Sequence, residues 1–297
     1  MLKTARHIEI QLIGDHFGNV IALFSRDCSI QRRHQKIIEE APAIICPQHI
    51  LQAMECGAIK IAKSVGYVGA GTVEYLYDIT TKEYFFLELN PRLQVEHPCT
   101  EIIANVNLPS CQLQVAIGKS LFEIEDLKNF MESQKNGAKK EEFPKGHVIS
   151  ARITAESAEE GFRPCNGCVK QLNFHSSKNI WGYFSVHAEG KLHKYADSQF
   201  GHLFSWGHTR EEARKGMVLA LKELSIHGEI RTTIDFLVSL MEHPIFLKNQ
   251  SNTEWLDNIK NDSNFFTKPD IKVIIACAAS CIGHQNFIKI TKDYEAA

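Results

Sequence analysis

The sequence predicts an α+β fold in which helices pack on an antiparallel sheet. Alternating apolar and polar residues flank a turn-rich segment between residues 7 and 25, which is the pattern of a β-hairpin. Residues 47–65 then place apolar side chains at helical spacing behind a proline, a residue common at helix N-termini. Two further strand-like runs, 71–77 and 84–90, are joined by a charged segment short enough for a second hairpin. Strands with such short connections pair in antiparallel order.

The later elements follow in chain order. A helix is expected over 108–117, because Gly118 closes its pattern. We place a connector between two lobes at 121–145, since its second half is rich in Lys, Glu, Gly, Asn and Ser. The first lobe is then 1–120, the second is 146–262, and the tail, 263–297, begins another region or is disordered. Three strand-like runs and two helical runs fill the second lobe: 148–154, 169–174, 181–186, 210–224 and 232–241.

Composition and charge narrow the class of function. The formal net charge is −2 and the isoelectric point is about 6.7, so the chain lacks the basic character of a nucleic-acid-binding protein. No unbroken apolar run approaches the ~18 residues of a membrane span, and the N-terminus lacks the apolar core of a signal peptide. We therefore expect a cytoplasmic protein with no nucleic-acid partner and no membrane span.

The cysteines indicate a reducing environment. There are nine of them, an odd number scattered along the chain, which fits free thiols better than a disulfide framework. Cys165 and Cys168 form a C-x-x-C motif around Asn-Gly. Asn-Gly favours a hairpin turn here, and a metal or redox site is the alternative.

The most informative segment runs from residue 88 to residue 97, where polar residues occupy alternate positions after an apolar run. In an extended chain, alternate side chains share one face. Five polar side chains would therefore point into one pocket: Glu88, Asn90, Arg92, Gln94 and Glu96. A solvated strand edge with ion pairs is the alternative explanation.

A second carboxylate strengthens the case for a site. Glu74 lies in the strand-like run before the charged segment, so the hairpin would set it beside Glu88 on the neighbouring strand. Two facing carboxylates repel each other unless a cation lies between them. Mg²⁺ is the simplest candidate, because it is often held by one or two carboxylates while substrate phosphates supply other ligands.

Two further cationic features are ambiguous when each is taken alone. Residues 31–36 gather three cations and a histidine, which suits either a solvated face or a site for phosphate and an anionic substrate. Arg152 interrupts an apolar strand and needs an anionic partner, which is either a structural carboxylate or a reactant. No nucleophile set for covalent catalysis can be assigned from the sequence.

Taken together, these motifs resemble the biotin carboxylase family of ATP-grasp enzymes. The resemblance rests on Gln31-Arg-Arg-His-Gln-Lys36, Gly69-Ala-Gly-Thr-Val-Glu74 and the segment from Glu88 to His97. It implies part of an ATP-grasp domain, an antiparallel sheet with helices, followed by the biotin carboxylase C-terminal lobe. The segments Lys178 to Val186 and Ala196 to Gly207 look like the eukaryotic acetyl-CoA carboxylase branch of this family.

The resemblance also implies roles for single residues. The metal ligands would be Glu74, Glu88 and Asn90, holding two Mg²⁺ or Mn²⁺ ions that bridge the phosphates of ATP. Bicarbonate would be bound by Lys36, Arg92, Gln94 and the backbone of Val95. Glu96 would deprotonate bicarbonate, and Arg152 would stabilise the biotin enolate after carboxyphosphate has formed. The nucleotide would further contact Leu2, His7, Gln31, His34 and Ile226.

The same resemblance implies partners and limits. The expected function is ATP- and bicarbonate-dependent carboxylation of biotin, as the biotin carboxylase component in a path to malonyl-CoA and fatty acids. The partners would be bicarbonate, a biotinyl carrier domain, the remainder of a longer carboxylase polypeptide and a second copy in a homodimer. The sequence shows no glycine-rich phosphate loop, so we expect a fragment that is inactive alone. The alternatives are a catalytically dead regulatory module and a propionyl- or pyruvate-type carboxylase.

Overall fold

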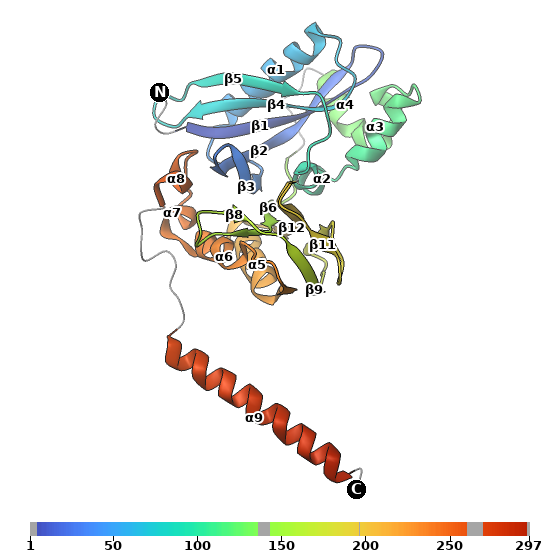
Figure 1. Ribbon diagram of the computed structural model, residues 1–297. Coiled ribbons are helices and arrows are strands. Elements are labelled where there is room, and N and C mark those ends of the chain that lie inside the picture. The colour runs from blue at the N-terminus through green and yellow to red at the C-terminus, as the bar shows by residue number, and fades with distance from the viewer. Residues whose placement is uncertain (1–4, 136–142, 196, 260–269, 296–297) are drawn as a thin grey trace. The chain divides into compact units, whose positions relative to one another are not determined.

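The main feature of the fold is one antiparallel sheet of eight strands, in the order β10-β12-β6-β3-β2-β1-β4-β5 (Figure 1). The computed structural model describes residues 5–135, 143–195, 197–259 and 270–295. The chain divides into two units, Met1–Asn261 and Asp262–Ala297, and each is treated by itself below. The sheet strands are β1 (Ala5–Gly14), β2 (Val20–Arg32), β3 (Gln35–Ala41), β4 (Gly69–Asp78), β5 (Tyr84–Asn90), β6 (His147–Thr154), β10 (Ile180–Phe184) and β12 (Gln199–Gly207).

Both predicted hairpins are confirmed. β1 pairs with β2 and β4 pairs with β5, in each case in antiparallel order. In the second hairpin Glu74 lies directly opposite Glu88, as the sequence predicted. Short turns therefore fix the register that brings these two carboxylates together.

The predicted helix behind the first hairpin is also confirmed. α1 (Gln48–Ser64) begins after Pro47 and packs its apolar face on β1, β2 and β4. Met54, Ala58 and Ala62 are buried at spacings of four residues, which keeps them on one face of the helix. The fully buried Ile8, Ile10 and Leu12 of β1 belong to the same core.

A second core forms around the helices that follow β5. These are α2 (His97–Ala104), α3 (Leu108–Ala116) and α4 (Lys128–Lys135), with short 3₁₀ turns at Leu121–Glu123 and Glu125–Leu127. The α3 prediction is confirmed, and Gly118 adopts the positive φ expected behind a helix end.

The segment expected as a solvated connector is folded in its first half. The side chains of Leu121, Ile124, Leu127, Phe130 and Met131 are buried in the second core. Residues 136–142, the most polar part of that segment, lie outside the described residues. The boundaries drawn between lobes stay a prediction, although β6 pairs with β3 and so continues the sheet across the expected connector.

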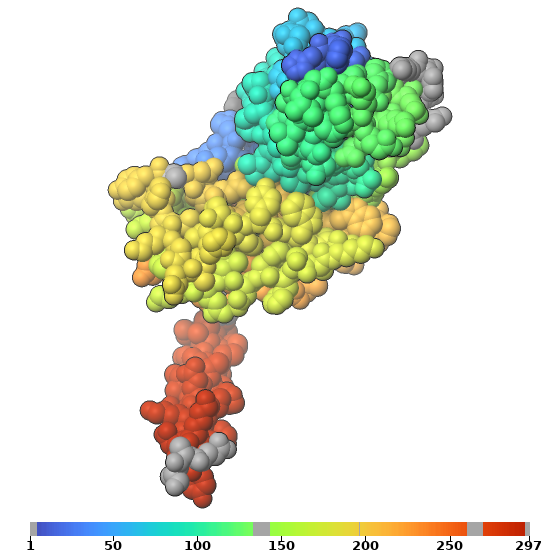
Figure 2. All heavy atoms as spheres, turned by 90° about the vertical axis from the view of Figure 1, so that its right-hand side faces the viewer, coloured from blue at the N-terminus to red at the C-terminus, as the bar shows by residue number. Residues whose placement is uncertain are grey.

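The chain after residue 146 adds the remaining strands and helices. β6 and β12 extend the main sheet, and Trp181 and Phe204 of this part pack with the second core. On the face seen in Figure 2, the helices after β5 (green) accordingly lie against the segment around β9 to β12 (yellow). The smaller sheets contain β7 (Glu156–Ser157), β8 (Arg163–Pro164), β9 (Gly167–Asn173), β11 (Lys191–Leu192) and β13 (Ser225–Gly228). The helices are α5 (Arg210–Glu223), α6 (Ile234–Glu242), α7 (Pro244–Leu247) and α8 (Trp255–Ile259).

The second unit contains one long helix, α9 (Ile271–Glu295). By length and composition its stretch Ile271–Tyr294 could cross a membrane. The expectation of no membrane span rested on the absence of a long apolar run, and this stretch did not count as one because Lys272, Ser280, His284, Gln285 and Asn286 interrupt it. Helices buried in protein cores meet the same criterion, so composition does not assign α9 to a membrane.

Candidate functional site

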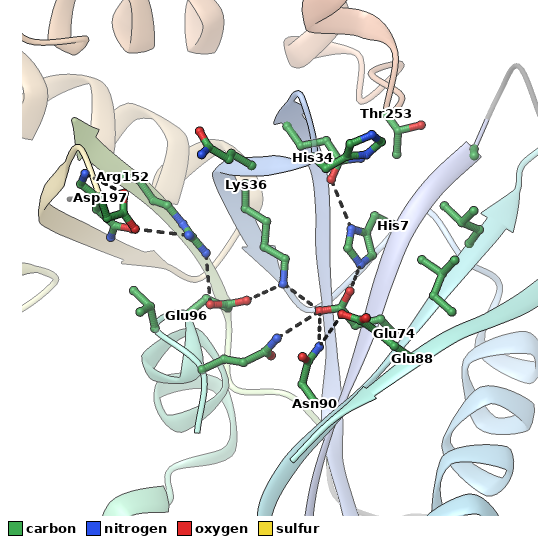
Figure 3. Close-up of a pocket in the computed structure, with 18 of the residues that line it drawn as sticks. His7, His34, Lys36, Glu74, Glu88, Asn90, Glu96, Arg152, Asp197 and Thr253 are labelled. Atoms are coloured by element: carbon green, nitrogen blue, oxygen red, sulfur yellow. Dashed lines mark hydrogen bonds and ion pairs between the residues drawn. The ribbon is translucent and has the colours of Figure 1, made fainter. Parts of the chain in front are cut away.

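A pocket of about 1050 Å³ gathers most of the predicted site residues (Figure 3). It lies between the strands that carry Glu74 and Glu88 and the strand that carries Arg152. The predicted residues that line it are His7, Gln31, His34, Lys36, Glu74, Glu88, Asn90, Arg92, Gln94, Val95, Glu96 and Arg152. Ile226 does not line this pocket: it lies on β13 and pairs with Leu172 of β9. Leu2 lies outside the described residues.

Three carboxylates form a row across neighbouring strands at the base of the pocket. Glu9 of β1 is the register partner of Glu74, and Glu74 is the partner of Glu88. Register partners in an antiparallel sheet project from the same face, so the three side chains lie side by side. Glu9 is fully buried, Glu74 is nearly so, and Glu88 is exposed. The row thus runs from the protein interior to the open side of the pocket.

Lys36 is the cation at the centre of the site. Its Nζ contacts Glu74 Oε1 at 3.0 Å and Glu96 Oε1 at 2.7 Å, and it also contacts Glu9. Burial alone would lower the pKa of Lys36, but the surrounding carboxylates outweigh burial and raise that pKa above its usual value. Lys36 is therefore a fixed positive charge.

Glu74 is held by neutral and cationic partners on several sides. His7 Nε2 lies 2.7 Å from Glu74 Oε2, while Asn90 Nδ2 and Gln94 Nε2 donate to Oε1 at 2.9 and 3.1 Å. Burial favours the protonated form, but the hydrogen bond from His7 and the charges of His7 and Lys36 lower the pKa of Glu74. Glu74 is therefore an ionised carboxylate at neutral pH.

The opposite wall of the pocket carries Arg152 on β6. Its Nε donates to Glu39 Oε1 at 2.6 Å, its Nη2 to Glu96 Oε2 at 3.2 Å and its Nη1 to Gln199 Oε1 at 3.4 Å. Glu39 is fully buried and also accepts hydrogen bonds from His202 and Ser150. Arg152 thus has the structural carboxylate that its burial requires, and it also faces the pocket.

Glu96 joins the two walls. One of its oxygens contacts Lys36 and the other contacts Arg152. The side chain is buried, with 2% of the residue exposed, although it comes from the loop behind β5. A carboxylate between two cations in a pocket is suitably placed to accept a proton from a bound reactant.

The predicted extended chain from residue 88 to residue 96 is only partly correct. β5 ends at Asn90, and the following residues form turns that lead into α2. Pro91 explains the end of the strand, because proline has no N–H for the ladder and fixes φ. The five polar residues still line one pocket, but the loop rather than strand alternation places Gln94 and Glu96 there.

Arg92 differs from the other cations of the site. It is exposed, and within the described residues its side chain makes one hydrogen bond, from Nη1 to Leu93 O at 3.3 Å. Within that part of the chain no carboxylate forms an ion pair with it. Next to it, the carbonyl of Val95 accepts a hydrogen bond of 3.2 Å from the hydroxyl of Tyr183. Arg92 therefore has its donors available for a ligand.

The expected nucleotide contacts lie on one side of the pocket. His7 Nδ1 lies 3.4 Å from Gln31 Oε1, and both side chains are buried. His34 is exposed in the turn between β2 and β3, where its φ is 65°. Thr253 and Ala5 line the same side, joined by a backbone hydrogen bond of 3.0 Å.

The donor set fits a hard divalent cation. Glu74 and Glu88 offer carboxylate oxygens, and the side-chain amide of Asn90 lies between them, at 2.9 and 3.1 Å. Its Nδ2 faces both carboxylates here; with the amide turned over, all three residues would present oxygen. His7, Glu9 and Glu74 form a second, deeper group whose ligand atoms lie within 4.8 Å of one another. An oxygen-rich set of this kind suits Mg²⁺ or Mn²⁺.

Sequence reasoning missed three buried charges behind the pocket: Glu9, Arg26 and Glu39. A signal existed for Glu9, since it alternates with His7 along β1 and so shares its face. The nine cysteines are free thiols, as expected. Cys165 and Cys168 lie between β8 and β9 and belong to no metal-type cluster among the described residues.

Family models and curated proteins match most of the chain. Residues 1–124 match the carbamoyl-phosphate synthase L chain ATP-binding domain, and residues 150–258 match the biotin carboxylase C-terminal domain. The acetyl-CoA carboxylase dmxL1 of Cryptosporiopsis sp. (strain 8999) is 49% identical over 95% of this chain, and this match covers 13% of its own length. The acetyl-CoA carboxylase of Schizosaccharomyces pombe is 48% identical over 94% of this chain and again 13% of its own length.

Solved structures agree with these matches. The biotin carboxylase domain of Hydrogenobacter thermophilus 2-oxoglutarate carboxylase, a dimer with MgADP and bicarbonate, has a TM-score of 0.80 and 31% identity. The match covers 91% of this chain and 55% of that one. Biotin carboxylase from Campylobacter jejuni has a TM-score of 0.77 and 38% identity, covering 87% of this chain and 54% of that one.

Proposed function

Because this chain belongs to the biotin carboxylase family, we propose that its pocket binds the metal, bicarbonate and biotin in ATP-dependent carboxylation of biotin. The observation that carries the proposal is the convergence of one carboxylate row, Lys36 and Arg152 on Glu96. The chain spans about half the length of the biotin carboxylase chains it matches and 13% of the curated carboxylases. The activity is therefore proposed for the longer enzyme.

Bicarbonate is the anion that suits the loop behind β5. A guanidinium such as that of Arg92 can grip a planar oxyanion with two parallel hydrogen bonds. Lys36 adds a fixed charge, and Gln94, whose Nε2 donates to Glu74 Oε1 at 3.1 Å, lines the same pocket. We place the backbone N–H of Val95 as a further donor, beside a carbonyl that is held by Tyr183.

Glu96 is the proposed general base. Its carboxylate takes the proton of bound bicarbonate, and the oxygen so freed attacks the γ-phosphorus of ATP while ADP leaves. Bound Mg²⁺ or Mn²⁺ at Glu74, Glu88 and Asn90 would neutralise phosphate charge during this step. Lys36 Nζ lies 2.7 Å from Glu96 Oε1 and so holds the proposed base in place before the proton moves.

Arg152 is the proposed partner of biotin. Carboxyphosphate breaks down to CO₂ and phosphate, and the phosphate takes the proton from the ureido N1 of biotin. Negative charge develops on the ureido oxygen as this proton leaves, and a fixed guanidinium stabilises it until N1 attacks CO₂. The fixed position of Arg152 between Glu39 and Glu96 supports this role.

The wider setting follows from the relatives. Acetyl-CoA carboxylases of eukaryotes are 47–49% identical to this chain, so we propose the biotin carboxylase component of such an enzyme rather than a propionyl- or pyruvate-type carboxylase. Biotin would arrive on a carrier domain. In the longer enzyme its carboxyl group would pass to acetyl-CoA, and the malonyl-CoA so formed would serve fatty acid synthesis. A homodimer and a cytoplasmic location stay predictions.

The experiment that tests this proposal measures phosphate release in a complete biotin carboxylase domain that carries this sequence. We expect ATP cleavage to require bicarbonate and Mg²⁺ and to be accompanied by carboxylation of free biotin. ATP cleavage that is indifferent to bicarbonate would contradict the proposal. Glu88→Gln is the matched variant, and it should raise the Mg²⁺ concentration needed for half-maximal rate.

A further inference from the structure

A second arginine, Arg26 on β2, lies behind the pocket and does not line it. Its side chain is fully buried, and each of the five N–H groups of the guanidinium has an acceptor. Nε donates to Glu9 Oε2 at 3.0 Å, Nη1 to Gln11 Oε1 and Thr100 Oγ1 at 2.7 and 2.9 Å, and Nη2 to Thr72 Oγ1 and Gln94 Oε1 at 3.2 and 2.8 Å.

The contact with Gln94 decides which end of that side-chain amide faces the pocket. Oxygen and nitrogen of an amide occupy nearly the same space, so the hydrogen-bond partners determine the orientation. Arg26 can only donate, and it therefore requires Oε1 on its side. Gln94 Nε2 is then directed to Glu74 Oε1, at 3.1 Å, on the pocket side. In the reverse orientation, the Gln94 N–H groups would face the guanidinium of Arg26, and the Gln94 amide oxygen would face the carboxylate of Glu74.

We propose that Arg26 is a positioning residue for the bicarbonate subsite, which it serves by holding the Gln94 amide with its N–H toward the anion. This inference rests on the proposed function, because bicarbonate is the anion concerned. Arg26 also ties separate parts of the fold together: Thr72 belongs to β4, Thr100 to α2 and Gln94 to the loop behind β5. The planar guanidinium of an arginine, with five N–H donors in fixed directions, can fix that loop. The ammonium group of a lysine has three donors and is not planar.

The competing explanation is that Arg26 only neutralises the buried Glu9. Glu9 accepts from Arg26 and Lys36, and both cations lower the pKa of that carboxyl against the opposing effect of burial. A counter-ion role predicts a loss of stability that is independent of Gln94. A positioning role predicts in addition a change at the Gln94 amide itself, which can be observed directly.

The test uses the 297-residue chain and its Arg26→Lys variant, which keeps the charge and removes the fork. The side-chain amide protons of Gln94 are assigned by ¹H–¹⁵N NMR from their loss in Gln94→Ala. We expect these protons to exchange slowly in the parent chain and at least tenfold faster in Arg26→Lys. In a complete biotin carboxylase domain carrying this sequence, titration with ¹³C-bicarbonate should give a dissociation constant about tenfold higher for Arg26→Lys, the size expected for one lost hydrogen bond to a charged group.

Three controls separate the explanations. Arg214→Lys changes another buried arginine, whose fork grips Glu211, and should leave the Gln94 signals and bicarbonate binding unchanged. In a Gln94→Ala background, Arg26→Lys should no longer weaken bicarbonate binding; an unchanged effect would overturn the proposal in favour of Glu9. Should Arg26→Lys fail to fold, Thr72→Val removes one acceptor from the same Nη2 and should shift the Gln94 signals in the same direction.

A complete biotin carboxylase domain carrying this sequence that binds no bicarbonate would contradict the proposed function, while the exchange rate of the Gln94 amide in the 297-residue chain would still decide the role of Arg26. Unchanged Gln94 exchange in both Arg26→Lys and Thr72→Val would overturn the positioning role, whatever the chain binds.

Discussion

The two walls of the pocket carry their charges differently. In the wall built on β1, β4 and β5, three carboxylates form a row, and Lys36 contacts the two inner ones, Glu9 and Glu74. In the wall built on β6, the guanidinium of Arg152 lies between the carboxylates of Glu39 and Glu96. Glu88, at the open end of the row, has only the amide of Asn90 as a hydrogen-bond partner among the described residues. The first wall therefore has room and negative charge for added cations. In the second wall the guanidinium of Arg152 is held by carboxylates on two sides, so it is fixed before any ligand arrives.

The comparison suggests that each wall serves a different reactant. Metal-bound phosphate suits the wall with surplus carboxylates, and the developing charge on biotin suits the fixed guanidinium. The loop between them carries Arg92, which is exposed and has no carboxylate partner among the described residues, so it is the cation most available to bicarbonate.

The largest effect on the rate of phosphate release is expected when this chain is compared with a complete biotin carboxylase domain. No glycine is among the described residues that line the pocket, so the two walls alone lack the phosphate-covering loop of ATP-grasp enzymes. We expect the 297-residue chain to release phosphate on the order of 10³-fold more slowly than a complete biotin carboxylase domain, because much of the rate comes from preorganised charge. The assay contains Mg-ATP, bicarbonate and biotin. Turnover close to that of the complete domain would show that these two walls suffice.

The next effect is expected where the walls meet. In a complete domain carrying this sequence, Glu96→Gln should lower kcat by about 10²- to 10⁴-fold, the range for a lost general base. Nucleotide affinity should stay nearly unchanged, because Glu96 contacts Lys36 and Arg152 rather than the outer end of the carboxylate row. Glu88→Gln is the contrasting variant and should weaken the use of Mg-ATP. Equal loss of nucleotide affinity in both variants would contradict the separation of metal binding from proton transfer.

The residues of the two walls show which features of the site could be predicted from the sequence. The facing pair Glu74 and Glu88 was predictable, because a short hairpin sets its own register. Arg26 and Glu39 were not, since their partners lie far along the chain: Arg26 meets Gln94, and Glu39 meets Arg152 and His202. The role of Ile226 rested on resemblance alone, and its side chain lies on a different sheet. Local patterns fix hairpins and helices, whereas buried ion pairs depend on tertiary contacts.

A smaller effect is expected behind the second wall. Glu39→Gln keeps the size of the side chain but removes the charge that holds Arg152 Nε at 2.6 Å. Carboxyl transfer to biotin should fall by about tenfold, as for one weakened charge-assisted hydrogen bond. Bicarbonate-dependent ATP cleavage without biotin should change little. A parallel loss in both reactions would place Glu39 in the common part of the site.

The smallest effect on catalysis is expected from substituting Glu40, the residue next to Glu39. Glu40 points to the other face of β3, where it accepts from Arg210 Nε at 2.6 Å and from His147 Nε2 at 3.2 Å. Burial opposes ionisation, yet these hydrogen bonds and charges lower the pKa of Glu40 from 4.5 to about 2. A carboxyl whose pKa is lower in the folded than in the unfolded chain stabilises the fold at any pH above the unfolded pKa. This stabilisation is lost as the pH falls through the folded pKa.

Glu40→Gln should therefore leave kcat unchanged and lower the free energy of unfolding by about 3 kcal/mol at pH 7. The difference from the parent chain should shrink as pH falls from 4.5 toward 2, the range set by the shifted pKa. Denaturant unfolding of both chains over this pH range measures it. A difference that does not depend on pH would show that packing, not charge, is lost.

The central claim, that the two walls serve different reactants, is tested most directly by comparing Arg92→Lys with Arg152→Lys. Both variants keep the charge and lose the guanidinium fork, and both are measured in a complete domain carrying this sequence. Arg92→Lys should depress bicarbonate-dependent ATP cleavage even without biotin. Arg152→Lys should spare that partial reaction and lower carboxyl transfer to biotin by about 10²-fold, as for one lost oxyanion donor. If Arg152→Lys loses biotin-independent ATP cleavage as severely as Arg92→Lys, both arginines serve one anion and the division between the walls is wrong.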